Sequence, residues 1–190
     1  MPASRSPRKI QQSPTGIDRA AAYGRTVPDL VPGTPGVLKV LLAGVNPGLV
    51  SGVRGLHFGN PANRLWPVLH HAGLTERRLR PEDTDELLAA GIGISNLVPR
   101  ATARADELTA AELREGVPRL TRLVTRVRPG KVAVLGISAY RVAFAEPRAV
   151  VGRQARTIAG RPVWLLPNPS GLNASYQMDA LIAAFAELAD

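Results

Sequence analysis

The chain contains no cysteine. This absence excludes disulfide bonds, cysteine-ligated iron–sulfur clusters and thiolate zinc sites. The side chains left as metal ligands are three histidines and the carboxylates. The nucleotide-binding patterns GxGxxG and GxxxxGK[ST] are missing as well. We therefore expect a protein that works without a metal or a cofactor.

Long apolar segments are also missing. No apolar run reaches the roughly 18 residues of a membrane-spanning helix, and the first residues carry Arg5, Arg8 and Lys9 without the apolar stretch of a secretory signal. We expect a cytoplasmic protein. With 190 residues, 45% of them hydrophobic, the chain has room for one domain with a substantial core. No apolar stripe is left unassigned, so we expect a monomer.

Acidic residues are scarce relative to basic ones. The chain has 24 Lys and Arg against 15 Asp and Glu, a net charge of +9, and most of the basic residues are arginine. Arginine binds phosphate through paired hydrogen bonds, and a basic domain attracts nucleic acid by releasing counterions. A GC-rich genome also raises the arginine content. Charge alone therefore favours nucleic-acid binding without establishing it.

The order of apolar and polar segments predicts the fold class. Proline, glycine, serine and charged residues dominate residues 1–36, which we interpret as a basic, flexible N-terminal arm with a short helix at 16–23. Residues 37–190 form the single domain. We predict strands at 38–43, 92–98, 131–135 and 163–166, and helices at 61–73, 81–91, 109–127, 138–145 and 174–188. Strands separated by helices indicate an α/β fold with three layers, α/β/α, around a central, mostly parallel sheet.

Two predicted strands end in an Asn-Pro motif, "GVNPGL" at 44–49 and "LPNPSGLN" at 166–173. Pro47 and Pro169 fix their own φ angles and favour an extended backbone at the preceding asparagines. In a parallel sheet, ligands bind outside the carboxyl ends of the strands, where both loops would meet. Either motif alone would be an ordinary turn. The pair predicts one cleft formed by both loops.

These motifs occur in a recognisable order with "GLHFGNPANRLWPVLHHAG", "SNLVPRAT", "AVLG" and "VWLLPNPSGLN". From about Leu38 to its end, the chain resembles the mismatch-specific uracil-DNA glycosylases, which are bacterial relatives of thymine-DNA glycosylase and family 2 of the uracil-DNA glycosylase superfamily. Neighbouring families carry Asp-Pro-Tyr in the first loop or His-Pro-Ser in the second, and some need four cysteines. This chain has asparagine in both loops and no cysteine.

The resemblance implies hydrolysis of the N-glycosidic bond of uracil, or of thymine or etheno-cytosine, mispaired with guanine in double-stranded DNA. The nucleotide would first be flipped out of the base stack, and the product would be an abasic site. Asn46 would hold the attacking water with its amide oxygen. An amide takes up no proton at neutral pH, so Asn46 would orient the water without being a true general base. Backbone N–H groups of the first loop would stabilise the departing base anion.

The resemblance also assigns the residues that contact the base. They would be Val45, Gly48, Phe58, Asn168 and Ser170. Phe58 would stack on the flipped base, although a core position is the alternative for a phenylalanine. His57 and Asn60 lie near this aromatic; both are candidates for adding polarity to the pocket, but we expect both at the surface.

The DNA contacts implied by the resemblance fall in two segments. A wedge would fill the gap left by the flipped nucleotide and consists of Gly171, Leu172 and Asn173. Arg100 and Arg104 would contact phosphates from the loop after Ser95 and Asn96, which end a predicted strand near the cleft. An exposed turn leucine and solvated arginines are the structural alternatives.

One position departs from the resembled family. Its members often continue the second motif as "NPSGLSR", whereas this chain has Ala174 where the arginine would stand. That arginine would grip the opposite strand or the unpaired guanine, so selectivity for guanine stays open. Two other classes also stay open. One is a broader uracil glycosylase, or a glycosylase for another damaged base such as an etheno adduct or hypoxanthine, and the other is a DNA-binding module without catalysis.

Overall fold

The computed structural model describes residues 19–189, and its centre is a five-stranded sheet. The strands are β1 (Val40–Gly44), β2 (Ile92–Asn96), β3 (Lys131–Leu135), β4 (Gly152–Ile158) and β5 (Arg161–Leu166). Their order across the sheet is β2-β1-β3-β5-β4. The first four strands in this order run parallel, and β4 pairs with β5 in the antiparallel direction at the edge.

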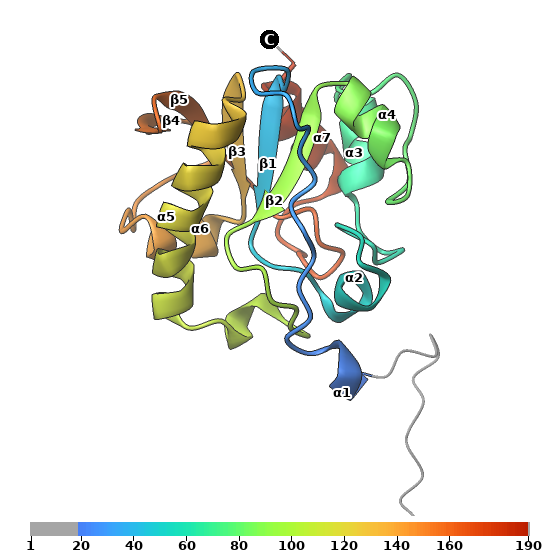
Figure 1. Cartoon of the computed structure of the whole chain (residues 1–190), viewed down its shortest axis with the longest axis vertical. Coiled ribbons are helices and arrows are strands. Elements are labelled where there is room, and N and C mark those ends of the chain that lie inside the picture. Colours follow the sequence, from blue (N-terminus) through green and yellow to red (C-terminus); the bar gives the residue numbers. More distant parts are fainter. Residues whose placement is uncertain (1–18, 190) are drawn as a thin grey trace, which may run out of the picture.

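Helices cover both faces of the sheet (Figure 1). On one face lie α5 (Ala110–Val127) and α6 (Ile137–Ala143), and on the other lie α3 (Leu65–His71), α4 (Thr84–Ala89) and α7 (Met178–Ala186). The short helices α1 (Arg19–Ala22) and α2 (Leu49–Arg54) and the 3-10 helix η1 (Ala105–Glu107) complete the described chain. The predicted three-layer α/β/α fold with a mostly parallel sheet is confirmed.

The central strands are apolar because both of their faces are covered. The sequences VLLAG in β1 and KVAVL in β3 are buried almost throughout. Alternate side chains point to opposite faces of a strand. Leu41 and Val132 therefore join the core under α5 and α6, while Leu42 and Ala133 join the core under α3 and α7.

Helix α2, the 3-10 helix η1 and strand β4 were not predicted from the sequence. Helix α2 lies in a segment for which we predicted neither a helix nor a strand, and a Cβ at Gly52 in this helix would lie only 2.7 Å from the Cβ of Ala101. The helix therefore depends on a close tertiary contact that local sequence does not reveal. Strand β4 has the sequence GRQARTI, which is mostly exposed at the sheet edge and lacks an apolar alternation.

Part of the predicted N-terminal arm packs against the sheet. The N–H of Leu30 donates to the carbonyl of Ile94 at 2.8 Å, and the N–H of Ile94 donates back at 2.9 Å. Val27 is buried. The packed domain thus includes residues that we assigned to the arm, while residues 1–18 lie outside the described chain. Within residues 19–189, no helix is long and apolar enough to span a membrane.

Candidate active site

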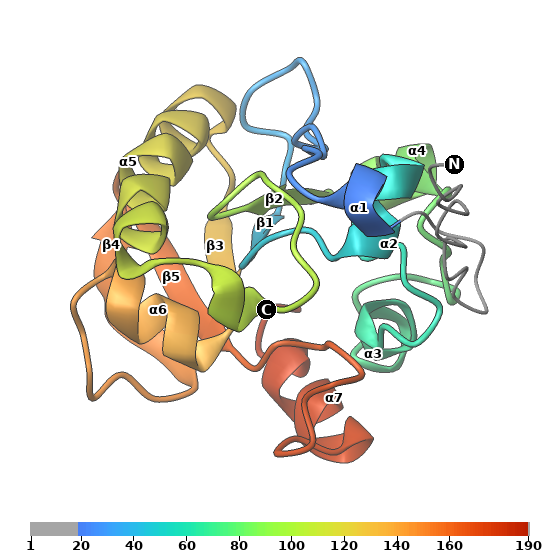
Figure 2. The same cartoon turned by 90° about the horizontal axis from the view of Figure 1, so that it is seen from below.

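A pocket of about 670 Å³ opens at the carboxyl edge of the sheet. Figure 2 looks onto this edge, where the segments after β1, β3 and β5 come together. The lining includes Val45 after β1, Gly136 after β3 and Arg104 before η1. From the segment after β5 it includes Asn168, Ser170, Leu172 and Asn173. Val45 of the first predicted loop thus lines one pocket with the second loop, whereas Asn46, Gly48 and Phe58 are not part of its lining.

The side chain of Asn46 is held by its amide nitrogen. Nδ2 donates to the carbonyl oxygens of Pro47 and Arg100, both at 3.1 Å, and to Oγ1 of Thr102 at 2.7 Å. The hydroxyl of Thr102 itself donates to the carbonyl of Arg104 at 2.7 Å, so it is free to accept from Asn46. All of these neighbours are acceptors, which assigns the nitrogen to this side of the amide.

This arrangement leaves the amide oxygen of Asn46 available. Among residues 19–189, no group donates a hydrogen bond to Oδ1. Asn46 is half-buried, and Thr102 behind it is fully buried. A fixed acceptor of this kind can orient a water molecule by accepting one of its hydrogens.

Phe58 lies beside the end of β1 with an unusual backbone. Its φ of 48° is in the left-handed region, which costs a residue other than glycine about 1–2 kcal/mol. Nε1 of Trp66 donates to the carbonyl of Phe58 at 3.2 Å and holds this backbone in place. The ring is partly exposed while it contacts the core under α3 and α7. Phe58 therefore has one face in the core and part of its surface available to a ligand.

Gly44 leaves the space in which Phe58 and Asn96 approach each other. A Cβ at Gly44 would lie 2.6 Å from Oδ1 of Asn96 and 3.3 Å from Cζ of Phe58. The position therefore admits no side chain without displacing one of these groups. The aromatic ring and the amide oxygen thus form one corner at Gly44, two residues before Asn46 in the chain.

His57 is buried, and our expectation of a surface position was wrong. Its Nε2 lies 2.8 Å from the carbonyl oxygen of Pro28, which can only accept, so Nε2 carries the hydrogen. Nδ1 then accepts from Nδ2 of Asn96 at 3.3 Å. Burial lowers the pKa of His57 from its ordinary value of 6.5, despite the opposing hydrogen bond to Pro28. A neutral histidine thus fixes the orientation of the Asn96 amide.

The same network ties the N-terminal segment to the end of β2. Nη2 of Arg119 contacts both carboxylate oxygens of Asp29, at 2.6 and 2.8 Å. Nη1 of Arg119 donates to the carbonyl of Asn96 at 2.7 Å, and the hydroxyl of Ser95 donates to Asp29 at 2.6 Å. Asn96 is therefore restrained through both its backbone and its side chain.

The buried histidine predicts a loss of stability in mild acid. The pKa of folded His57 lies below 6.5, so between that lowered pKa and about 6.5 the unfolded chain binds more protons. The free energy of unfolding then rises with pH through this window, and the contribution of His57 is constant above it. We expect the unfolding free energy, measured with urea at pH 5.5 and 7.5, to fall less on acidification in His57→Gln than in the wild type. His71→Gln, at an exposed position on α3, is the control and should follow the wild type. An equal pH dependence in all three proteins would contradict the prediction.

The second loop is folded back on itself by its own polar groups. Oδ1 of Asn168 accepts from the N–H of Ser170 at 3.1 Å, and Nδ2 of Asn173 donates to the carbonyl of Asn168 at 2.9 Å. Gly171 passes so close to the 60–64 turn that a Cβ would lie 2.7 Å from the carbonyl oxygen of Ala62. The side chain of Leu172 is left 83% exposed. Neither core cluster within residues 19–189 includes Leu172.

The predicted phosphate contacts are engaged with carboxylates. Nη2 of Arg100 donates to Glu112 at 3.0 Å, and this partner lowers the pKa of Glu112 to about 2. Nη2 of Arg104 donates to Asp106 at 2.6 Å. Gly48 is exposed at the start of α2 and bridges to Thr102. Contact of the two arginines with DNA stays a prediction, and it would require them to exchange or share these partners.

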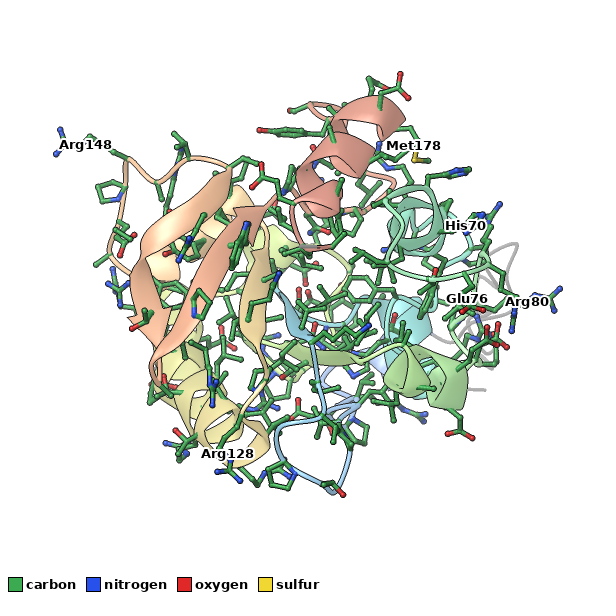
Figure 3. All side chains as sticks on the ribbon, turned by 90° about the horizontal axis from the view of Figure 1, so that it is seen from above. His70, Glu76, Arg80, Arg128, Arg148 and Met178 are labelled. Atoms are coloured by element: carbon green, nitrogen blue, oxygen red, sulfur yellow. The ribbon has the colours of Figure 1, made fainter. Side chains whose placement is uncertain are left out.

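Two residues of the site were missed at the sequence level. Thr102 holds Asn46, and Arg64 donates to several carbonyls of the second loop. Both residues belong to motifs quoted above, but no local sequence pattern marks a threonine or an arginine as part of a site. His70 projects from the outer side of α3 (Figure 3), and its Nδ1 lies 3.3 Å from the carbonyl oxygen of Thr75. Arg128 and Arg148 also project outward in that view.

The sheet, its covering helices and the converging loops define an α/β protein with a pocket at the carboxyl ends of its strands, where ligands bind in folds of this kind. The model of the Uracil DNA glycosylase superfamily matches residues 32–189. The chain therefore belongs to this superfamily, whose members are DNA glycosylases and hence hydrolases. The fold is also similar to a solution NMR structure of a "putative Uracil DNA glycosylase" from Methanosarcina acetivorans, with a TM-score of 0.60 and 18% sequence identity. That match covers 88% of this chain and 99% of the other.

Proposed function

We propose that this superfamily member is a mismatch-specific, monofunctional uracil-DNA glycosylase. It releases uracil opposite guanine in double-stranded DNA and leaves an abasic site. The observation that carries the proposal is the half-buried Asn46, whose amide nitrogen is tied to three acceptors while its oxygen stays available. Such an oxygen can hold a water molecule in one direction, which is what hydrolysis of the glycosidic bond requires.

In the proposed reaction, the bond from the base to the sugar carbon breaks and the water oxygen forms the new bond to that carbon. Asn46 orients this water through Oδ1, and its dipole favours the positive charge that develops on the sugar. An amide does not accept the proton of the water at neutral pH, so the proton passes to solvent or to the departing base. Backbone N–H groups of the first loop stabilise the base anion. Slow turnover follows, since no true general base takes part.

The corner beside Gly44 supports recognition of the flipped base. In this proposal Phe58 stacks on the ring of the flipped base. Oδ1 of Asn96 lies at the same corner and can accept a hydrogen bond. Uracil carries a hydrogen on N3 that such an oxygen can accept, whereas cytosine has a bare nitrogen there. Because His57 holds Nδ2 of Asn96, the oxygen is the atom that points toward this corner. Val45, Asn168 and Ser170 line the adjoining pocket.

The exposed Leu172 supports the DNA part of the proposal. An apolar side chain inserted into a base step offsets the cost of unstacking, and a mismatched pair is the easiest to open. Gly171 and Asn173 shape the turn that presents Leu172. Arg104 lines the same pocket as Leu172, Arg100 lies four residues earlier in the chain, and both would contact phosphates. The protein acts on DNA as a monomer.

The test is base release from four matched fluorescent duplexes, with G·U, A·U, G·T and G·etheno-C pairs, followed by alkali to cleave abasic sites. We expect cleavage of G·U well above A·U, and loss of that cleavage in Asn46→Ala. Equal cleavage of both uracil duplexes would replace the proposal with a broader uracil glycosylase. Cleavage of G·etheno-C alone would indicate a damaged-base glycosylase. No cleavage of any duplex, with binding retained, would indicate a DNA-binding module.

A further inference from the structure

Arg64 makes a fork of hydrogen bonds to the backbone of the second loop. Its Nη1 donates to the carbonyl of Tyr176 at 2.7 Å, and its Nη2 donates to the carbonyls of Ser170 and Asn173, both at 2.8 Å. Its own backbone N–H donates to the carbonyl of Pro169 at 2.9 Å. One residue at the start of α3 thus binds four successive points of a segment more than a hundred positions away.

The two carbonyls bound by Nη2 are the two ends of the turn that carries Leu172. The N–H of Asn173 closes this turn by donating to the carbonyl of Ser170 at 3.0 Å. A single nitrogen of Arg64 therefore spans the base of the turn, while Leu172 stands 83% exposed at its tip. The guanidinium thus acts together with the loop's own hydrogen bonds, from Ser170, Leu172 and Asn173, in holding the base of this turn.

A guanidinium suits this task because its N–H groups lie in one rigid plane. Lysine has a single ammonium group on a flexible stem. It therefore cannot donate at once to all the carbonyls that Nη1 and Nη2 of Arg64 reach. The Nε of Arg64 is buried and has no partner within residues 19–189. Lysine has no Nε, so the exchange to lysine removes an unpaired buried donor while it keeps the charge. We therefore expect Arg64→Lys to fold and to lose the fork.

We propose that Arg64 is the positioning residue for the Leu172 wedge. It holds the turn in the conformation that enters the DNA, so that the loop is already ordered when the nucleotide flips. Ordering a loop before binding avoids paying its conformational entropy at the moment of binding. The inference rests on the proposed function, since it assigns Arg64 to the flipping step of that reaction. It assigns no contact between Arg64 and the base.

The kinetic test compares paired with unpaired uracil. Single-turnover base release is measured on a G·U duplex and on a single-stranded uracil oligonucleotide for the wild type, Arg64→Lys, Leu172→Ala and Arg78→Lys. We expect Arg64→Lys and Leu172→Ala to lose about tenfold on the duplex and to keep the single-strand rate, because only the duplex needs the wedge. Arg78 is exposed, and Arg78→Lys should match the wild type on both substrates. An equal loss on both substrates, or no loss in Arg64→Lys, would overturn the inference.

A second measurement uses no DNA and separates the inference from the proposed function. Hydrogen exchange of the 168–176 segment is followed in the free protein for the wild type, Arg64→Lys and Arg78→Lys. We expect faster exchange of the Asn173 amide in Arg64→Lys alone, because its turn loses the hydrogen bonds at its base. Unchanged exchange would overturn the positioning role of Arg64 even in an active enzyme. Faster exchange in a protein that releases no base would support the positioning role of Arg64 and would reject the proposed function.

Discussion

Base release from a G·U duplex is expected to fall by about 10²- to 10⁴-fold when Asn46 is replaced by alanine, the range lost when a group that acts on the reacting water is removed. The reason is geometric. Oδ1 of Asn46 is the acceptor that the first loop leaves free, and the amide reaches this position because three acceptors hold its nitrogen. DNA affinity should change little, because it derives mainly from contacts to phosphates. Single-turnover base release and fluorescence anisotropy, measured on the same duplex, test the two statements separately.

Two further variants show whether orientation or mere presence of a polar group matters. In Asn46→Asp, a carboxylate oxygen would replace Nδ2 and face the carbonyls of Pro47 and Arg100, which repel it. We expect no recovery of the rate at neutral pH. Thr102→Val removes the shortest of the three hydrogen bonds and should give an intermediate rate. A rate in Asn46→Ala close to that of the wild type would reject the assignment of Asn46.

Replacing Gly44 by alanine is expected to abolish most of the base release by another route. The new Cβ would lie 2.6 Å from Oδ1 of Asn96 and 3.3 Å from the ring of Phe58, so one of the two must move. Overpacking of this kind costs about 1–3 kcal/mol of stability. The displaced group would no longer meet the base, and we expect at least about a hundredfold loss in kcat/KM, since small displacements in a site can cost this much. Urea unfolding and base release on the G·U duplex measure both effects.

The matched control is Gly130→Ala, at the opposite edge of the sheet. A Cβ at Gly130 would lie 2.8 Å from the carbonyl oxygen of Lys39, so this variant is overpacked to a similar degree away from the pocket. We expect a similar loss of stability with nearly normal base release under conditions in which the protein is folded. Equal loss of activity in the two variants would mean that stability, and not the corner beside Gly44, limits the reaction.

The parts of the fold that could be predicted are those in which the local pattern of apolar residues matches the burial of the element in the structure. Strands β1 and β3 are covered on both faces, so their sequences are continuous apolar runs. Helix α5 begins with Thr109 and Glu112 in a capping box and has apolar residues at helical spacing. Helix α2 and strand β4 lack these signals, since one depends on contact with Ala101 and the other lies at an exposed edge.

Some features of the candidate site could likewise be predicted from the sequence, and others could not. The places of the two Asn-Pro loops after parallel strands predict one cleft, and the pocket is lined by Val45 of the first motif and by Asn168 and Ser170 of the second. The burial of His57 could not be predicted, because its carbonyl partner comes from Pro28 in a segment that we assigned to the arm. The fork of Arg64 could not be predicted either, since its acceptors are backbone carbonyls and leave no trace in side-chain identity.

The sequence by itself determined the three-layer fold, the pairing of the two loops and the resemblance that pointed to the superfamily, because periodicity and motif order are local properties of the chain. Only the tertiary structure decided which side of the Asn46 amide is available, how Phe58 and Asn96 meet at Gly44, and what holds Leu172 at the tip of its turn. These features depend on hydrogen bonds and close approaches between segments far apart in the chain. A hydrogen bond is strong only over a few tenths of an ångström, so its partners are defined by packing and not by composition.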